Sequence, residues 1–178
     1  MIRYLDLEQG SALWHKIREC YVTGTDAHWF FGRKLKTPDQ IITEKHLAKP
    51  FGGNYYTRRG HLLEPIAKEI YSKLKQPVKD QGFIINDKYP KAGYSPDGLT
   101  EDGLVECKCF EEKAHRKNLL KVEPKILHQI QFGLFVTERP YCDLILFNPE
   151  IEQENSFKVW RIKPQAKWQD KFKEIVWE

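Results

Sequence analysis

The segment Ser95-Pro96-Asp97-Gly98-Leu99, followed after a short gap by Leu104-Val105-Glu106-Cys107-Lys108, decides how this sequence folds. The residue types around both segments favour short strands, and the Asp102-Gly103 pair between them is typical of a tight hairpin turn. We therefore predict a hairpin that joins a strand over residues 92–95 to a strand over residues 104–108.

This predicted hairpin gathers charged side chains. Residues two apart on a strand project from the same face, so Glu106 and Lys108 should share one face and Cys107 should lie on the other. An acid and an ammonium group on an apolar strand are costly to bury unless they are used. The hairpin also folds Asp97 back towards Glu106, and two carboxylates then converge with one lysine.

Two converging carboxylates suit a hard divalent cation. Mg²⁺ prefers oxygen ligands, takes few carboxylates and keeps water and phosphate oxygens in its other positions. Asp97, Glu106 and the backbone carbonyl of Cys107 form such a ligand set, and Lys108 would stabilise a metal-bound hydroxide or the charge that develops on a scissile phosphate. The alternative interpretation is a surface Glu–Lys pair beside an ordinary turn, because Glu-x-Lys alone is a weak motif.

Periodicity outside the hairpin predicts a mixed α/β fold. We expect helices over 11–20, from a Thr25 cap, from Thr37-Pro38, and over 56–74, 124–137 and 165–177. Further strands are expected over 82–85, 141–147 and 157–162. The polar, basic stretch 111–121 has no assigned element. The predicted class is α/β, with a central mixed β-sheet flanked by α-helices and a single domain over 1–178.

Composition excludes several classes of protein. The 178 residues are 40% hydrophobic and 30% charged, which is typical of a globular chain and not of a disordered one. A net charge of +4 permits nucleic-acid binding where cations cluster. The four cysteines do not form a zinc set and are expected to be reduced thiols. No apolar run reaches membrane length and no signal peptide is recognised, so we expect a cytoplasmic protein that does not contact membranes.

These motifs resemble a known nuclease family. Pro96-Asp97 with Glu106-x-Lys108 looks like the PD-(D/E)xK signature, and the flanking residues are similar to the phage-type exonucleases of the lambda exonuclease and YqaJ-like viral recombinase group. Similar motifs are spread over most of the chain, in order: Trp14-His15-Lys16-Ile17-Arg18, Thr23-Gly24-Thr25-Asp26, Gly60 with Glu64, Ala67 and Tyr71, the hairpin itself, and His128-Gln129-Ile130-Gln131. Five ordered motifs are far more specific than any single one.

The resemblance implies a restriction-endonuclease-like core and a function. It implies Mg²⁺-dependent degradation of linear double-stranded DNA, 5′→3′ from 5′-phosphorylated ends, which leaves single strands for recombination; Mn²⁺ would substitute for Mg²⁺. The expected partners are double-stranded DNA ends and a single-strand annealing protein, in a bacterial host cell. Members can form homotrimeric rings, but this chain is short for the family, so its oligomeric state stays open.

Further site residues follow from the resemblance. Glu64 would reach the metal directly or through water, although it would also fit as an ordinary acid of an exposed helical face, as Glu69 does. Gln129 would orient Lys108 or the attacking water with its amide, and it ranks above Gln131, which faces another direction.

Basic residues are the candidates for contacts with DNA. The resemblance implies that Arg18 and Thr25 hold the 5′-phosphate, because a terminal phosphate needs a cation and hydrogen-bond donors. A further basic ligand of that phosphate is expected among Lys113, His115, Arg116 and Lys117; Arg116 is preferred, but the choice stays open. The surrounding cations are expected to contact backbone phosphates, although a charge run is usually a solvated face: Arg58, Arg59, Lys113 and Lys117.

Three alternatives stay open. A RecB/Cas4-like nuclease would often hold an iron–sulfur cluster with four cysteines, and that spacing is absent. A restriction-type endonuclease would keep the hairpin without needing Arg18 and Thr25. A non-catalytic DNA-binding recombination module would have no reason to keep acids beside phosphates.

Overall fold

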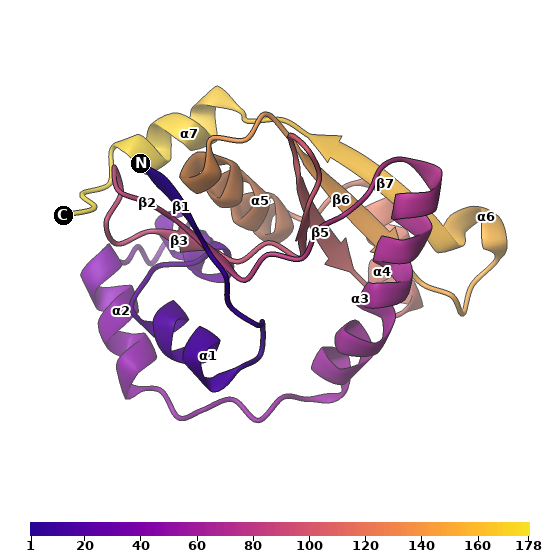
Figure 1. Ribbon diagram of the computed structural model, residues 1–178, viewed down its shortest axis with the longest axis horizontal. Helices are drawn as coiled ribbons and strands as arrows, with labels where there is room; N and C mark the ends of the chain where they lie inside the picture. Colours follow the sequence, from indigo (N-terminus) through magenta and orange to yellow (C-terminus); the bar gives the residue numbers. More distant parts are fainter.

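The strands of the computed structural model, which describes all of residues 1–178, form two sheets (Figure 1). The first is antiparallel, in the order β1-β2-β3. The second is mixed, in the order β4-β5-β6-β7, with β5 and β6 parallel and the other pairs antiparallel. The bounds are β1 Ile2–Leu5, β2 Phe83–Asn86, β3 Gly93–Tyr94, β4 Gly98–Leu99, β5 Leu104–Lys108, β6 Cys142–Phe147 and β7 Phe157–Ile162.

The hairpin of the second sheet differs from the predicted one. The strand over 92–95 ends at Tyr94 in the first sheet, and the Asp102-Gly103 turn joins β4 to β5. Pro96 has no N–H for a ladder, and the Ser95 hydroxyl donates to the Gly82 carbonyl at 2.7 Å. The chain therefore leaves the first sheet at Ser95 and enters the second just after Asp97.

Helices cover the second sheet on both faces (Figure 1). Helix α5 packs against β5 on one face and also contacts β2, β3, η1 and α7. Helix α4 lies on this same face, where Leu119 contacts the α5 cluster and the Asn118 carbonyl accepts from Trp160 Nε1, whereas α3 packs against β5 and β6 on the other face. The bounds are α1 Ala12–Glu19, η1 Gly24–Phe30, α2 Pro38–Leu47, α3 Tyr55–Leu74, α4 Glu112–Leu120, α5 Pro124–Thr137, α6 Gln153–Ser156 and α7 Ala166–Lys173. The stretch 111–121, which had no assigned element, is therefore mostly the helix α4.

Helix starts follow local chemistry. The Thr37 hydroxyl accepts from the N–H of Gln40 and Pro38 takes the first helical position, as predicted for α2. The prediction that Thr25 caps the next short helix is wrong. Thr23 holds the N-cap position of η1, and its N–H and hydroxyl both donate to the Asp26 carboxylate.

Two apolar clusters lie on opposite faces of the second sheet. The larger one joins α5, η1 and α7 to Leu104 and Leu144, and the smaller one joins Ala67 and Tyr71 of α3 to β5 and β6. The apolar residues that recur at helical spacing along α3 do not all face this cluster, since Leu62 is 74% exposed. No helix is long and apolar enough to cross a membrane.

Candidate active site

Glu106 stands at the centre of the site. It is fully buried on β5, and its carboxylate accepts hydrogen bonds from the hydroxyl of Tyr94 and from the amide Nε2 of Gln129, the latter at 2.9 Å. Lys108 Nζ lies 3.6 Å from Glu106 Oε2. Cys107 points the other way and packs with Ala67 and Tyr71 of α3, so the predicted division of the two faces of this strand is confirmed.

The environment of Glu106 disfavours its charge. Burial raises the pKa of this carboxyl to about 8, and the neighbouring Asp97 carboxylate acts in the same direction. Lys108 and the hydrogen bond from Tyr94 lower it but do not cancel the effect of burial. A cation bound beside Glu106 would favour the charged form of this carboxyl.

Asp97 is held at both its backbone and its side chain. Its carboxylate oxygen Oδ2 accepts from the backbone N–H of Cys107 at 2.7 Å, and its carbonyl oxygen accepts from Lys68 Nζ at 2.8 Å. The first contact ties the start of β4 to β5. Asp97 is therefore folded back beside Glu106, as the hairpin predicted.

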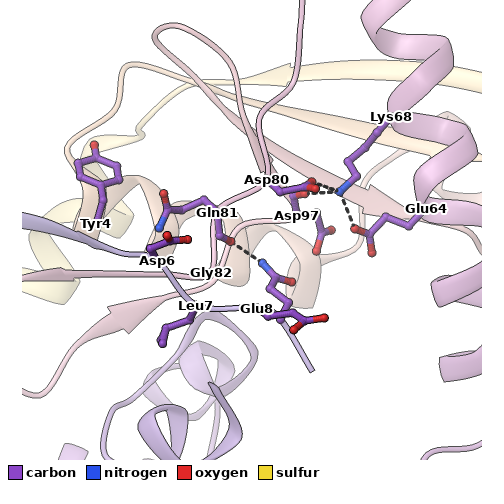
Figure 2. Close-up of a pocket in the computed structure, with 11 residues that line it drawn as sticks. Tyr4, Asp6, Leu7, Glu8, Glu64, Lys68, Asp80, Gln81, Gly82 and Asp97 are labelled. Atoms are coloured by element: carbon purple, nitrogen blue, oxygen red, sulfur yellow. Dashed lines mark hydrogen bonds and ion pairs between the residues drawn. The ribbon is translucent and has the colours of Figure 1, made fainter. Parts of the chain in front are cut away.

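Helix α3 brings Glu64 and Lys68 to the same place. Figure 2 shows the side chains of Glu64 and Asp97 beside the pocket, with the Lys68 ammonium between them and Asp80. Lys68 Nζ lies 3.2 Å from Glu64 Oε1 and 2.8 Å from Asp80 Oδ1. Burial and then the Asp97 charge raise the pKa of Glu64, while Lys68 opposes them. This pocket has a volume of about 540 Å³ and is lined by these four residues together with Tyr4 and residues 6–9 and 81–82.

The oxygen donors are of the type that a hard divalent cation takes. No three side chains of the acid, histidine or cysteine type lie together as a ready metal cage. Asp97 and Glu106 nevertheless converge, the Cys107 carbonyl lies on the same strand segment, and Glu64 stands across from Asp97. Two carboxylates with one carbonyl are a typical protein share of a Mg²⁺ shell that water and phosphate complete.

Lys108 carries a positive charge in this site. Burial disfavours the ammonium, but the Glu106 and Asp97 carboxylates raise the pKa of Lys108 above its usual value. A protonated lysine donates hydrogen bonds and cannot take a proton from water. The protonated state of Lys108 therefore favours stabilisation of negative charge on a phosphate over general-base catalysis.

Arg18 lies beside the same acids. Its guanidinium carbon lies 4.1 Å from the centroid of the Trp14 ring. Burial lowers the pKa of Arg18, whereas Asp26, Glu106 and Asp97 oppose this effect. Asp26 is already paired with Lys45 at 2.8 Å, so Arg18 keeps its donors free. Thr25 is exposed, one residue into η1, and its hydroxyl has only the Thr23 hydroxyl at 3.3 Å as a partner.

The other predicted cations divide into free and engaged ones. Arg59 is only 8% exposed and donates to the carbonyl of Cys109 and the side chains of Asn148 and Glu150. Its guanidinium joins α3 to the chain segments after β5 and β6, and the expected contact of Arg59 with DNA phosphates stays a prediction.

Helix α4 shows the same division. Arg116 is clamped by Glu112 and Glu152, and Lys117 pairs with Glu123 at 3.0 Å. Such partners oppose the 5′-phosphate role expected for Arg116. Lys113 is exposed on this helix and Arg58 is exposed on α3, and both are without an ion-pair partner.

Sequence reasoning missed two residues of this site. Tyr94 precedes the Ser95-Pro96-Asp97 motif, and its role depends on a ring that reaches from the first sheet into the second. Lys68 lies one helical turn after Glu64, and that spacing was a usable signal for an ion pair. Gln129 was predicted to orient Lys108 or water, whereas its amide donates to Glu106.

Comparison with known proteins agrees with this architecture. The YqaJ-like viral recombinase domain matches residues 13–140. No curated protein matches the sequence significantly. Among solved structures, the fold is similar to "an alkaline exonuclease (LHK-Exo) from Laribacter hongkongensis", with a TM-score of 0.78 and 22% identity over 92% of this chain and 89% of that chain.

Two further structures have the same fold. LHK-Exo in complex with dAMP gives a TM-score of 0.80 at 22% identity, over 92% of this chain and 87% of that chain. A phage-related exonuclease from Haemophilus somnus 129PT gives 0.65 at 13% identity, over 90% and 92%. These likenesses confirm the predicted α/β fold.

Proposed function

Because the chain belongs to the YqaJ-like viral recombinase domain family and is an enzyme of the nuclease type, we propose that it is a metal-dependent DNA exonuclease. Its substrate is linear double-stranded DNA, which it degrades 5′→3′ from 5′-phosphorylated ends to leave single strands for recombination. The convergence of Asp97, Glu106 and Lys108 at a buried position carries the proposal. The titles of the solved relatives, which name exonucleases, support the same reaction class.

The candidate site residues have different roles in this reaction. Mg²⁺, or Mn²⁺ in its place, would bind to Asp97, Glu106 and the Cys107 carbonyl, and would supply Lewis-acid polarisation of the phosphate and of a water. Lys108 holds its proton at Nζ and donates a hydrogen bond to a phosphate oxygen as negative charge grows there. Glu64 would orient a water of the metal shell.

The direction of degradation requires recognition of one DNA end. A terminal phosphate carries more charge than an internal phosphodiester, and Arg18 offers an unpaired guanidinium beside the catalytic acids. Thr25 adds an exposed hydroxyl close to it in sequence. Arg58 and Lys113, which are exposed and without ion-pair partners, contact backbone phosphates further along the duplex.

Two variants test the chemistry. Lys108→Ala should abolish cleavage of end-labelled linear duplex in gels and leave DNA binding intact, since the acids stay in place. Asp97→Asn should remove the Mg²⁺ isotherm in calorimetry. Turnover at the wild-type rate in the lysine variant would contradict the proposed site.

A third variant tests the direction and separates the exonuclease from the alternatives. Arg18→Ala should lower the rate on 5′-phosphorylated ends by about ten- to a hundredfold, the value of a charge-assisted hydrogen bond, and change the rate on 5′-hydroxyl ends little. Cleavage of closed circular DNA would instead favour the restriction-type or RecB/Cas4-like endonuclease. DNA binding without any cleavage in Mg²⁺ or Mn²⁺ would favour a binding module.

Partners follow from the same proposal. The single strands produced would pass to a single-strand annealing protein in the cytoplasm of a bacterial host. Assembly of this chain into a trimer is tested by light scattering at several protein concentrations, with and without duplex DNA.

A further inference from the structure

The ring of Tyr94 is enclosed by two glycines from different helices. A Cβ atom on Gly24 of η1 would lie 2.7 Å from Tyr94 Cε2, and one on Gly133 of α5 would lie 2.3 Å from Tyr94 Cζ. Both distances are shorter than carbon atoms tolerate, so any other residue at either position would displace the ring. The two glycines therefore make the space in which Tyr94 lies.

This enclosed ring delivers a hydroxyl group to the metal site. Tyr94 belongs to β3 of the first sheet, but its hydroxyl donates to Glu106 Oε1 on β5 of the second sheet. Gln129 from α5 donates to the other oxygen, Oε2, at 2.9 Å. The two donors together fix the plane of the Glu106 carboxylate, and each oxygen keeps a lone pair for another partner.

Gly24 also packs closely against Gln129, the second donor to Glu106. A Cβ atom on Gly24 would lie 2.9 Å from Gln129 Cγ. Tyr94 and Gln129 thus share one tightly packed wall, and the position of that wall sets the orientation of Glu106.

We propose that Tyr94 is a positioning residue of the metal site, where its hydroxyl, held in place by Gly24 and Gly133, orients the Glu106 carboxylate as a ligand for a divalent cation. This inference rests on the proposed function for the role of Glu106. Groups that orient a metal ligand from behind typically change metal affinity by about ten- to a hundredfold when they are removed.

Calorimetric titration of the whole chain with Mg²⁺ alone tests this role. Tyr94→Phe keeps the ring and removes the hydroxyl, and it should weaken Mg²⁺ binding by roughly tenfold. Tyr71→Phe is the matched control, because the Tyr71 hydroxyl also donates to a buried carboxylate, that of Asp143. Both variants lose a buried hydrogen bond from a tyrosine to a carboxylate, and Tyr71→Phe also loses the acceptor of Gln76 Nε2 at 3.4 Å, but only Tyr94→Phe should lose metal affinity.

A glycine variant gives a second test that leaves every polar group in place. Gly24→Ala should weaken Mg²⁺ binding at least as much as Tyr94→Phe, by moving both donors. Gly60→Ala is its control, since a Cβ atom on Gly60 meets nothing within 4 Å. Thermal unfolding without metal, measured for all four variants, separates loss of affinity from loss of fold.

The outcomes distinguish this inference from the proposed function. Wild-type Mg²⁺ affinity in a folded Tyr94→Phe chain would overturn the positioning role, whether or not the wild-type chain degrades DNA. Equal losses of affinity in Tyr94→Phe and Tyr71→Phe would overturn it too, because the effect would then be structural. Weaker Mg²⁺ binding in Tyr94→Phe alone supports it even if the wild-type chain leaves DNA intact, a result that would remove only the exonuclease proposal.

Discussion

Two buried carboxylates on adjacent strands, Glu106 on β5 and Asp143 on β6, differ in the positive charge that surrounds them. Each is at most 1% exposed and each accepts a hydrogen bond from the hydroxyl of a buried tyrosine, Tyr94 or Tyr71. They lie on opposite faces of the sheet, with Glu106 towards α5 and Asp143 towards α3. The two neighbouring strands therefore repeat one local motif on two faces.

The difference between the two acids lies in their counter-charge. Asp143 meets the guanidinium of Arg161 through two contacts, of 2.9 and 2.8 Å, and is fully paired. Glu106 makes a single ion pair, with Lys108 at 3.6 Å, and it also faces the Asp97 charge. A paired acid stabilises the sheet, whereas an acid with too little positive charge around it is prepared to bind a cation.

The largest effect is expected at Glu106 and concerns the rate of DNA cleavage. Glu106→Gln should lower the DNA cleavage rate on the order of a thousandfold, comparable with the loss of one group that stabilises a transition state. The midpoint of urea unfolding should not fall, because the variant removes a carboxyl whose charge burial disfavours. Rates are measured on 5′-phosphorylated duplex, and a stable variant with wild-type activity would refute the assignment.

The next effect is expected at Asp143 and concerns stability. Arg161→Ala leaves the buried Asp143 without a counter-charge, and it should lower the free energy of unfolding by about 3 kcal/mol, the lower end for a broken buried pair, because Arg161 itself is half exposed. Calorimetric Mg²⁺ affinity should stay at the wild-type value. A loss of Mg²⁺ affinity here would mean that the two acids are not independent.

A smaller effect is expected from the cation next to the site. Lys68→Met removes the ammonium that contacts Glu64 and the Asp97 carbonyl, and should lower the cleavage rate about tenfold, the value of one charge-assisted hydrogen bond. Lys73→Met is the control, since Lys73 makes the same i,i+4 contact on the same helix with the exposed Glu69. Equal rates for the two variants would show that the Lys68 contacts do not matter for the reaction.

The smallest effect concerns alkaline stability. Burial and the hydrogen bond to Asp143 raise the pKa of Tyr71 to about 12 from its usual 10. The folded chain keeps this proton where the unfolded chain loses it, so the stability that it contributes is full below pH 10 and is lost as the pH rises towards 12. The decline of the urea midpoint between pH 10 and 12 should therefore be less steep in Tyr71→Phe than in the wild-type chain.

The sequence by itself predicted the family, the fold class and the convergence of the acids. Alternation along a strand placed Glu106 and Lys108 on one face and Cys107 on the other, and the family match and solved structures confirm the fold. These features depend on residues close together in the chain, where strand geometry leaves little choice. The roles of the site residues stay predictions.

Contacts between segments that are distant in the chain could not be predicted from the sequence. Helix α4 carries a weak apolar pattern, and its buried residues His115 and Asn118 gain contacts from the Asn155 carbonyl and from Trp160 Nε1, 40 and 42 residues further along the chain. Tyr94 became a partner of Glu106 because the chain changes sheets at Ser95, which no local pattern indicated.

The neighbours Arg58 and Arg59 show most directly what only the tertiary structure decided. Both were expected to contact DNA, and nothing in the sequence distinguishes them. One residue along a helix is a rotation of about 100°, so Arg58 faces solvent while Arg59 points inward to Asn148 and Glu150. Helical periodicity states that the two side chains diverge, but which of them meets protein depends on where the segment after β6 lies against α3.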